Sequence, residues 1–74
     1  MRADAGAALR LSVNGDEVEV PVGTTVSELL ARLDVEPRGV AVAVDGEVVT
    51  RRTWSERPLA HGERVEILSI AQGG

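Results

Sequence analysis

Two glycine-containing dipeptides constrain the fold of this chain more than any other feature. Asn14-Gly15 and Asp45-Gly46 are typical of the two-residue turns that join antiparallel strands, because these residues tolerate positive φ. Apolar and polar residues alternate on both sides of the first turn, which predicts a hairpin over roughly residues 8–13 and 16–21. The apolar run over residues 40–44 precedes the second turn and predicts a strand that is covered on both faces, or nearly so.

One amphipathic helix is predicted between the two hairpins. Thr25 and Glu28 have the spacing of a capping box, in which the threonine hydroxyl accepts a backbone N–H and the glutamate reaches back. Apolar residues at helical spacing form one stripe, which we interpret as core: Val26, Leu29, Leu30 and Leu33. Because Pro37 prevents a longer helix, we expect it to span residues 25–34.

The last third of the chain predicts a crossover and a final strand. Residues 51–62 contain turn formers, and we expect Trp54 and Leu59 to anchor this crossover in the core. His61 is expected in a solvent-facing turn. The alternating run over residues 65–70 then predicts the final strand.

The order of these elements predicts one α+β domain with a mixed sheet of about five strands. The helix has a single apolar stripe, so it must cover one face of that sheet. We expect the last strand to pair beside the first, at the centre of the sheet. The domain is predicted over residues 9–70, after a flexible leader over residues 1–8 and before a mobile tail over residues 71–74.

Composition argues against several classes of function. The net charge of −4 provides no basic face that could displace counterions from nucleic acid. The chain has no cysteine and one histidine, which leaves no thiolate metal site, cysteine nucleophile or multi-histidine cluster. It has no lysine, which disfavours a modifier that builds chains on itself. No membrane span or secretory leader is apparent, so the cytoplasm is the expected compartment.

The end of the sequence carries its strongest functional signal. Gly73 and Gly74 have no side chains, so they can enter a slot too narrow for other residues and present the final carboxylate to another protein. Glycine-rich ends that simply fray are also common. The pair therefore gains meaning only from the domain that precedes it.

That domain resembles the ThiS-like sulfur carriers of thiamine biosynthesis, within the ubiquitin-like β-grasp family. The resemblance covers about residues 9–74 and is carried by the segments VNGD (13–16), TVSELL (25–30), GVAVAVDGEVV (39–49), LAHGERVEI (59–67) and QGG (72–74). Each segment alone is weakly specific, but their order and spacing together are specific. The leader and the sequence around Gly62 depart from the family pattern, and neither departure touches the tail.

The resemblance implies a chemical cycle on the carboxylate of Gly74. A partner of the ubiquitin-activating type would adenylate it with ATP and magnesium, both bound by that partner. A cysteine desulfurase or another sulfur donor would then supply the sulfur of a thiocarboxylate, which thiazole synthase would accept. The chain itself would bind no cofactor and no metal, and it would be a cosubstrate rather than an enzyme.

Alternation along the final strand predicts a docking surface for these partners. If Val65 and Ile67 face the core, then Glu66, Leu68 and Ile70 face outward. The partner-binding residues are predicted to be Glu66, Leu68, Ile70, Ala71 and Gln72, with Ala41 and Ala43 beside them. A strand bulge that buries Leu68 is the alternative.

Charged residues near this strand are expected to differ in their part in docking. Glu63 and Glu66 are both expected to meet basic groups on a partner. Arg51-Arg52 is interpreted as a solvated loop pair rather than a docking element.

Other functions share parts of this pattern. The small subunit of molybdopterin synthase has the same fold and tail, but the approach Ser69-Ile70-Ala71-Gln72 lacks the proline or aromatic residue that tends to occur there. A sulfur carrier for another pathway, a protein modifier that forms isopeptide bonds through Gly74, and an interaction module with a dispensable tail remain alternatives.

Overall fold

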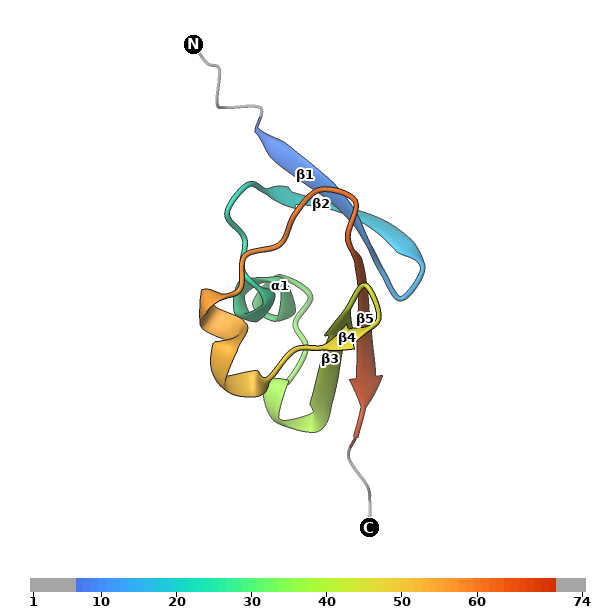
Figure 1. Cartoon of the computed structure of the whole chain (residues 1–74), viewed down its shortest axis with the longest axis vertical. Coiled ribbons are helices and arrows are strands. Elements are labelled where there is room, and N and C mark those ends of the chain that lie inside the picture. Colours follow the sequence, from blue (N-terminus) through green and yellow to red (C-terminus); the bar gives the residue numbers. More distant parts are fainter. Residues whose placement is uncertain (1–6, 71–74) are drawn as a thin grey trace.

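The computed structural model describes residues 7–70 (Figure 1). Its elements, in order, are β1 (Ala8–Val13), β2 (Asp16–Pro21), α1 (Val26–Arg32), the 3₁₀ helix η2 (Pro37–Gly39), β3 (Val40–Val44), β4 (Glu47–Val48), the 3₁₀ helix η3 (Arg51–Glu56) and β5 (Arg64–Ser69). The predicted tail over residues 71–74 lies outside the described residues, as does most of the predicted leader.

The strands form one five-stranded mixed sheet in the order β2-β1-β5-β3-β4. β5 pairs in parallel with β1 and antiparallel with β3, so the last strand is central and lies beside the first, as predicted. The helix α1 covers one face of the sheet (Figure 1). The α+β architecture with one main helix is therefore confirmed.

Both predicted turns are present, and both place their residues at positive φ. Asn14 and Gly15 have φ of 50° and 90°, while Asp45 and Gly46 have φ of 52° and 87°. The first turn joins strands with the predicted bounds, and the second joins β3 to the short strand β4. Local turn chemistry thus fixes the register of both hairpins.

The helix α1 begins as predicted but ends earlier. The Thr25 hydroxyl accepts the Glu28 backbone N–H, and the Glu28 carboxylate accepts the Thr25 N–H, each at 3.1 Å. At the other end Asp34 has φ of 61°, and the N–H of Val35 donates to the Leu30 carbonyl at 2.9 Å. This is a Schellman-type ending, so the helix stops before Pro37 could limit it.

The core lies between α1 and the sheet. The predicted helix stripe is buried at Val26, Leu29 and Leu30, whereas Leu33 is only half-buried at its edge. Trp54 and Leu59 are each 5% exposed, and the Trp54 indole N–H donates to the Val49 carbonyl at 2.9 Å. The expected anchoring of the crossover by these two residues is confirmed, although its 3₁₀ helix η3 was not predicted.

Candidate functional site

The end of β5 and the residue after it present two large apolar side chains to solvent. Val65 is fully buried and Ile67 packs against the core, whereas Leu68 and Ile70 are 56% and 51% exposed. The pairing of β5 with β3 runs without interruption from Val44↔Val65 to Val40↔Ser69. The alternative in which a bulge buries Leu68 is therefore wrong.

Neighbouring strands extend this surface on the sheet face that points away from α1. Ala41 lies directly opposite Leu68, and Ala43 lies opposite both Glu66 and Val48. Ala43 is only 7% exposed and so contributes little, contrary to expectation. We define the outer patch as Ala41, Val48, Leu68 and Ile70.

Val48 is a member of the outer patch that sequence reasoning missed. Its side chain is 78% exposed on the short edge strand β4. The sequence could have indicated this position. A two-residue turn at Asp45-Gly46 pairs residue 43 with residue 48 and so places both side chains on one face of the sheet.

The two glutamates expected to meet a partner have different surroundings. The Glu63 carboxylate accepts the Ala60 backbone N–H at 2.8 Å and pairs with Arg57 at 3.2 Å, and its side chain is only 15% exposed. Glu63 is therefore engaged within the protein, and its role in docking stays a prediction. It closes the loop that leads into β5.

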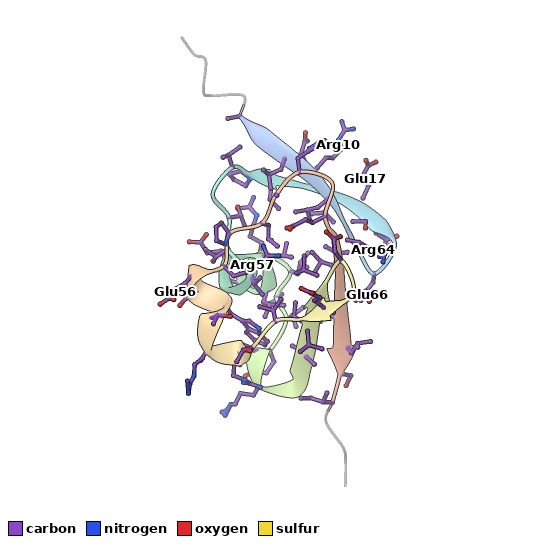
Figure 2. All side chains as sticks on the ribbon, viewed as in Figure 1. Arg10, Glu17, Glu56, Arg57, Arg64 and Glu66 are labelled. Carbon is purple, nitrogen blue, oxygen red and sulfur yellow. The ribbon has the colours of Figure 1, made fainter. Side chains whose placement is uncertain are left out.

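Glu66 remains as the acidic residue of the docking surface. It lies on β5 between Arg64 and Leu68, on the same face of the sheet, and is half-buried (Figure 2). Within residues 7–70 its carboxylate has no hydrogen-bond or ion-pair partner. A half-buried carboxylate without a local partner is suited to pairing with a cation on another protein.

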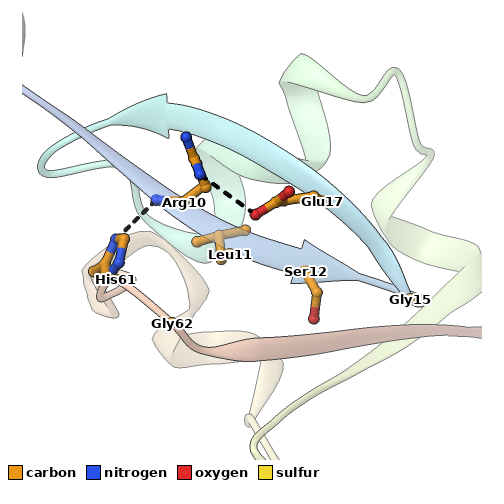
Figure 3. Close-up of a pocket in the computed structure, with 7 residues that line it drawn as sticks. All are labelled: Arg10, Leu11, Ser12, Gly15, Glu17, His61 and Gly62. Carbon is orange, nitrogen blue, oxygen red and sulfur yellow. Dashed lines mark hydrogen bonds and ion pairs between the residues drawn. The ribbon is translucent and has the colours of Figure 1, made fainter.

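A hollow lies near the start of β5, at the end opposite Ile70 (Figure 3). Arg10 pairs with Glu17 at 3.7 Å along its rim, and the Arg10 backbone N–H donates to Nδ1 of His61 at 3.1 Å. His61 is exposed in a turn, as predicted, but its hydrogen bond to β1 was not foreseen. Arg10, Glu17 and His61 thus serve to connect β1, β2 and the turn that contains His61.

Among residues 7–70, no three His, Asp or Glu side chains are grouped so that they could hold a metal ion. None of the described helices has the length and apolar character required to cross a membrane. Arg51 and Arg52 are exposed, and the Arg51 guanidinium lies 5.2 Å from the centre of the Trp54 ring.

The predicted reactive residues follow directly after the described part of the chain. Ala71, Gln72, Gly73 and Gly74 lie outside residues 7–70. The last described residue, Ile70, is held at the end of η2, directly before β3, because its N–H donates to the Gly39 carbonyl at 2.9 Å. Leu68 and Ile70 of the outer patch thus lie immediately before the predicted tail in the sequence.

Comparisons with known proteins give a consistent result. The model of the ThiS family matches residues 7–74. The sulfur carrier protein ThiS of Escherichia coli is 27% identical over 66 residues, which cover 89% of this chain and all of that protein. A crystal structure of a thiamine biosynthesis protein (ThiS) from Geobacter metallireducens has a TM-score of 0.78 and 33% identity, covering 89% of this chain and all of that one.

One further relative is a larger protein. A thiazole synthase of Paramagnetospirillum magneticum is 32% identical over 66 residues, which cover 89% of this chain but only 20% of that enzyme. Most of that protein thus has no counterpart in the present chain.

Proposed function

The chain belongs to the ThiS family, and from that premise we propose that it carries sulfur on the carboxylate of Gly74. It is a sulfur carrier protein for thiamine biosynthesis and not a catalyst. The observation that supports Gly74 most directly is that the family match extends through residue 74. The central strand of the sheet, β5, ends five residues before Gly74.

The proposed cycle begins with activation of the carboxylate. A carboxylate is a poor electrophile because its negative charge repels a nucleophile. An adenylating partner of the ubiquitin-activating type joins a carboxylate oxygen of Gly74 to the α-phosphorus of ATP and releases pyrophosphate. The magnesium and the ATP belong to that partner, and the carrier supplies only the carboxylate.

Sulfur transfer follows from the reactivity of the acyl-adenylate. Sulfide, supplied by a donor directly or released from the persulfide of a cysteine desulfurase by a thiol reductant, attacks the Gly74 carbonyl carbon and displaces AMP. The product is a thiocarboxylate, and, as with thiols, its anionic sulfur is the nucleophile. A chain without cysteine can carry sulfur in this way because the sulfur is bonded to the backbone end.

Thiazole synthase is the proposed acceptor of the sulfur. The thiazole synthase of Paramagnetospirillum magneticum contains a stretch similar to this chain, which supports a direct partnership between carrier and enzyme. We place this exchange in the cytoplasm, where ATP for the adenylation step is produced. Nucleic acid and membranes have no part in the proposal.

The outer patch and Glu66 are proposed as the docking surface for these partners. Leu68 and Ile70 offer apolar area that is about half exposed, and Glu66 offers a carboxylate for a cation on the partner. Ala71 and Gln72, which follow Ile70 in the sequence, are proposed to contact the partner as well. A small patch of this kind suits transient contacts, since the carrier must leave one partner before meeting the next.

Reconstituted thiazole formation tests the proposal. Thiazole synthase with its carbon and nitrogen substrates, the adenylating enzyme, ATP and a sulfur donor should form product with the full chain and none with a chain that lacks Gly74. Circular dichroism should show the same fold for both, because the core lies within residues 9–65. Product formation with the shortened chain would exclude Gly74 as the carrier of sulfur.

A further inference from the structure

The first residue of each hairpin turn directs its side chain onto β5. Asp45 accepts the Arg64 backbone N–H through Oδ1 at 2.8 Å, near the start of the strand. Asn14 accepts the Ile67 backbone N–H through Oδ1 at 2.8 Å and donates from Nδ2 to the Ile67 carbonyl at 3.2 Å. The two turns therefore hold opposite halves of β5.

The Asn14 carboxamide continues the ladder between β1 and β5 beyond the end of β1. The backbone N–H of Asn14 donates to the Val65 carbonyl at 2.9 Å. In a parallel ladder, a residue whose N–H donates to Val65 would accept, through its own carbonyl, the N–H two residues further along β5, which is that of Ile67. Here the backbone has entered the turn to Gly15, and the side-chain amide, which has the same donor and acceptor as a peptide group, takes that position.

This contact lies where β5 loses its other neighbour on that side. β1 pairs only with Arg64 and Val65, whereas β3 accompanies β5 as far as Ser69. Asn14 thus holds β5 two residues beyond the end of its pairing with β1. Leu68 follows Ile67 directly, and Ile70 is three residues after Ile67.

We propose that Asn14 is a positioning residue for sulfur transfer. Its carboxamide fixes the direction in which the end of β5 presents Leu68, Ile70 and the residues that follow to the adenylating partner. The proposal rests on the function proposed above. It does not require Asn14 to touch the partner or the reacting atoms.

The conformation of the turn does not itself require this side chain. Asn14 has φ of 50°, and glycine adopts such angles at least as readily as asparagine. Asn14→Gly should therefore keep the hairpin and remove only the two hydrogen bonds to Ile67. Asp45→Gly is a matched control, because it keeps an equivalent turn and removes a hydrogen bond to β5 at the end remote from Gly74.

The test measures pyrophosphate exchange by the adenylating enzyme over a range of concentrations of the full-length carrier. Asn14→Gly should raise the KM for the carrier about tenfold and change kcat little, because docking suffers while the tail chemistry is intact. Asp45→Gly should leave KM at the wild-type value. Hydrogen exchange at the Ile67 amide should accelerate in Asn14→Gly but not in Asp45→Gly.

Two results would overturn the positioning role: an unchanged KM for Asn14→Gly, or an equal rise in KM for both glycine variants. In either case thiocarboxylate formation on the wild-type chain would leave the proposed function standing, whereas its absence would remove that function itself. Should Asn14→Gly fail to fold, Asn14→Asp decides the question. It keeps the acceptor for the Ile67 N–H and loses the donor, so its KM should also rise, and a wild-type KM would count against the proposal.

Discussion

Replacement of Leu68 by alanine should weaken docking without weakening the fold. Complete burial of a leucine side chain contributes about 1.5–3 kcal/mol. Leu68 is 56% exposed in the free protein, so a partner that covers it would gain roughly half of that contribution. The alanine keeps the β-carbon, and the expected loss is about 1 kcal/mol, or about fivefold in Kd.

Isothermal titration calorimetry against the adenylating enzyme measures this loss. Val22→Ala is a suitable control, because Val22 is 60% exposed but follows the edge strand β2, which β1 separates from β5. It should bind as the wild type does. Thermal unfolding should give both variants a stability within about 0.5 kcal/mol of the wild type, since each side chain is largely outside the core.

The pattern of the two variants decides the interpretation. If Leu68→Ala binds with the wild-type Kd, the outer patch does not contact this partner and the burial argument is refuted. Equal weakening by Val22→Ala and Leu68→Ala would also refute it, because the loss would then not be confined to the face that carries β5.

Two further predictions concern the core and the tail. Leu30→Ala should lower the free energy of unfolding by about 2–5 kcal/mol in urea denaturation, because Leu30 is 1% exposed and its loss leaves a cavity; a change near zero would mean that the helix contributes little to the core. Gly73→Val should abolish adenylation, measured by pyrophosphate exchange, while leaving the melting temperature unchanged; wild-type exchange would remove the argument for a slot that only glycine can enter.

Local chemistry explains why much of the fold could be predicted from the sequence. Asn14-Gly15 and Asp45-Gly46 define their turns within a few residues, and Thr25 and Glu28 define the start of α1 in the same way. The end of α1 was predicted too late, because Asp34 takes the left-handed conformation that glycine usually supplies. An aspartate there carries little sequence signal.

Those parts of the candidate site that depend only on strand alternation, namely which side chains face outward, could be predicted from the sequence. Alternation placed Leu68 and Ile70 outward and Val65 inward, as the structure has them. It could not show that Glu63 is bound by Arg57 and Ala60, because that depends on how the loop before β5 closes. The contact between Asn14 and Ile67 joins residues 53 positions apart, which no local pattern reveals.

The most direct test of the account is the location of the sulfur atom. The full chain is incubated with the adenylating enzyme, ATP and a sulfur donor, and intact and fragment masses are then measured. The account predicts that one oxygen is replaced by sulfur and that the change is confined to the fragment ending at Gly74. Sulfur on any other residue, or a carrier that supports thiazole formation while its mass never changes, would contradict it.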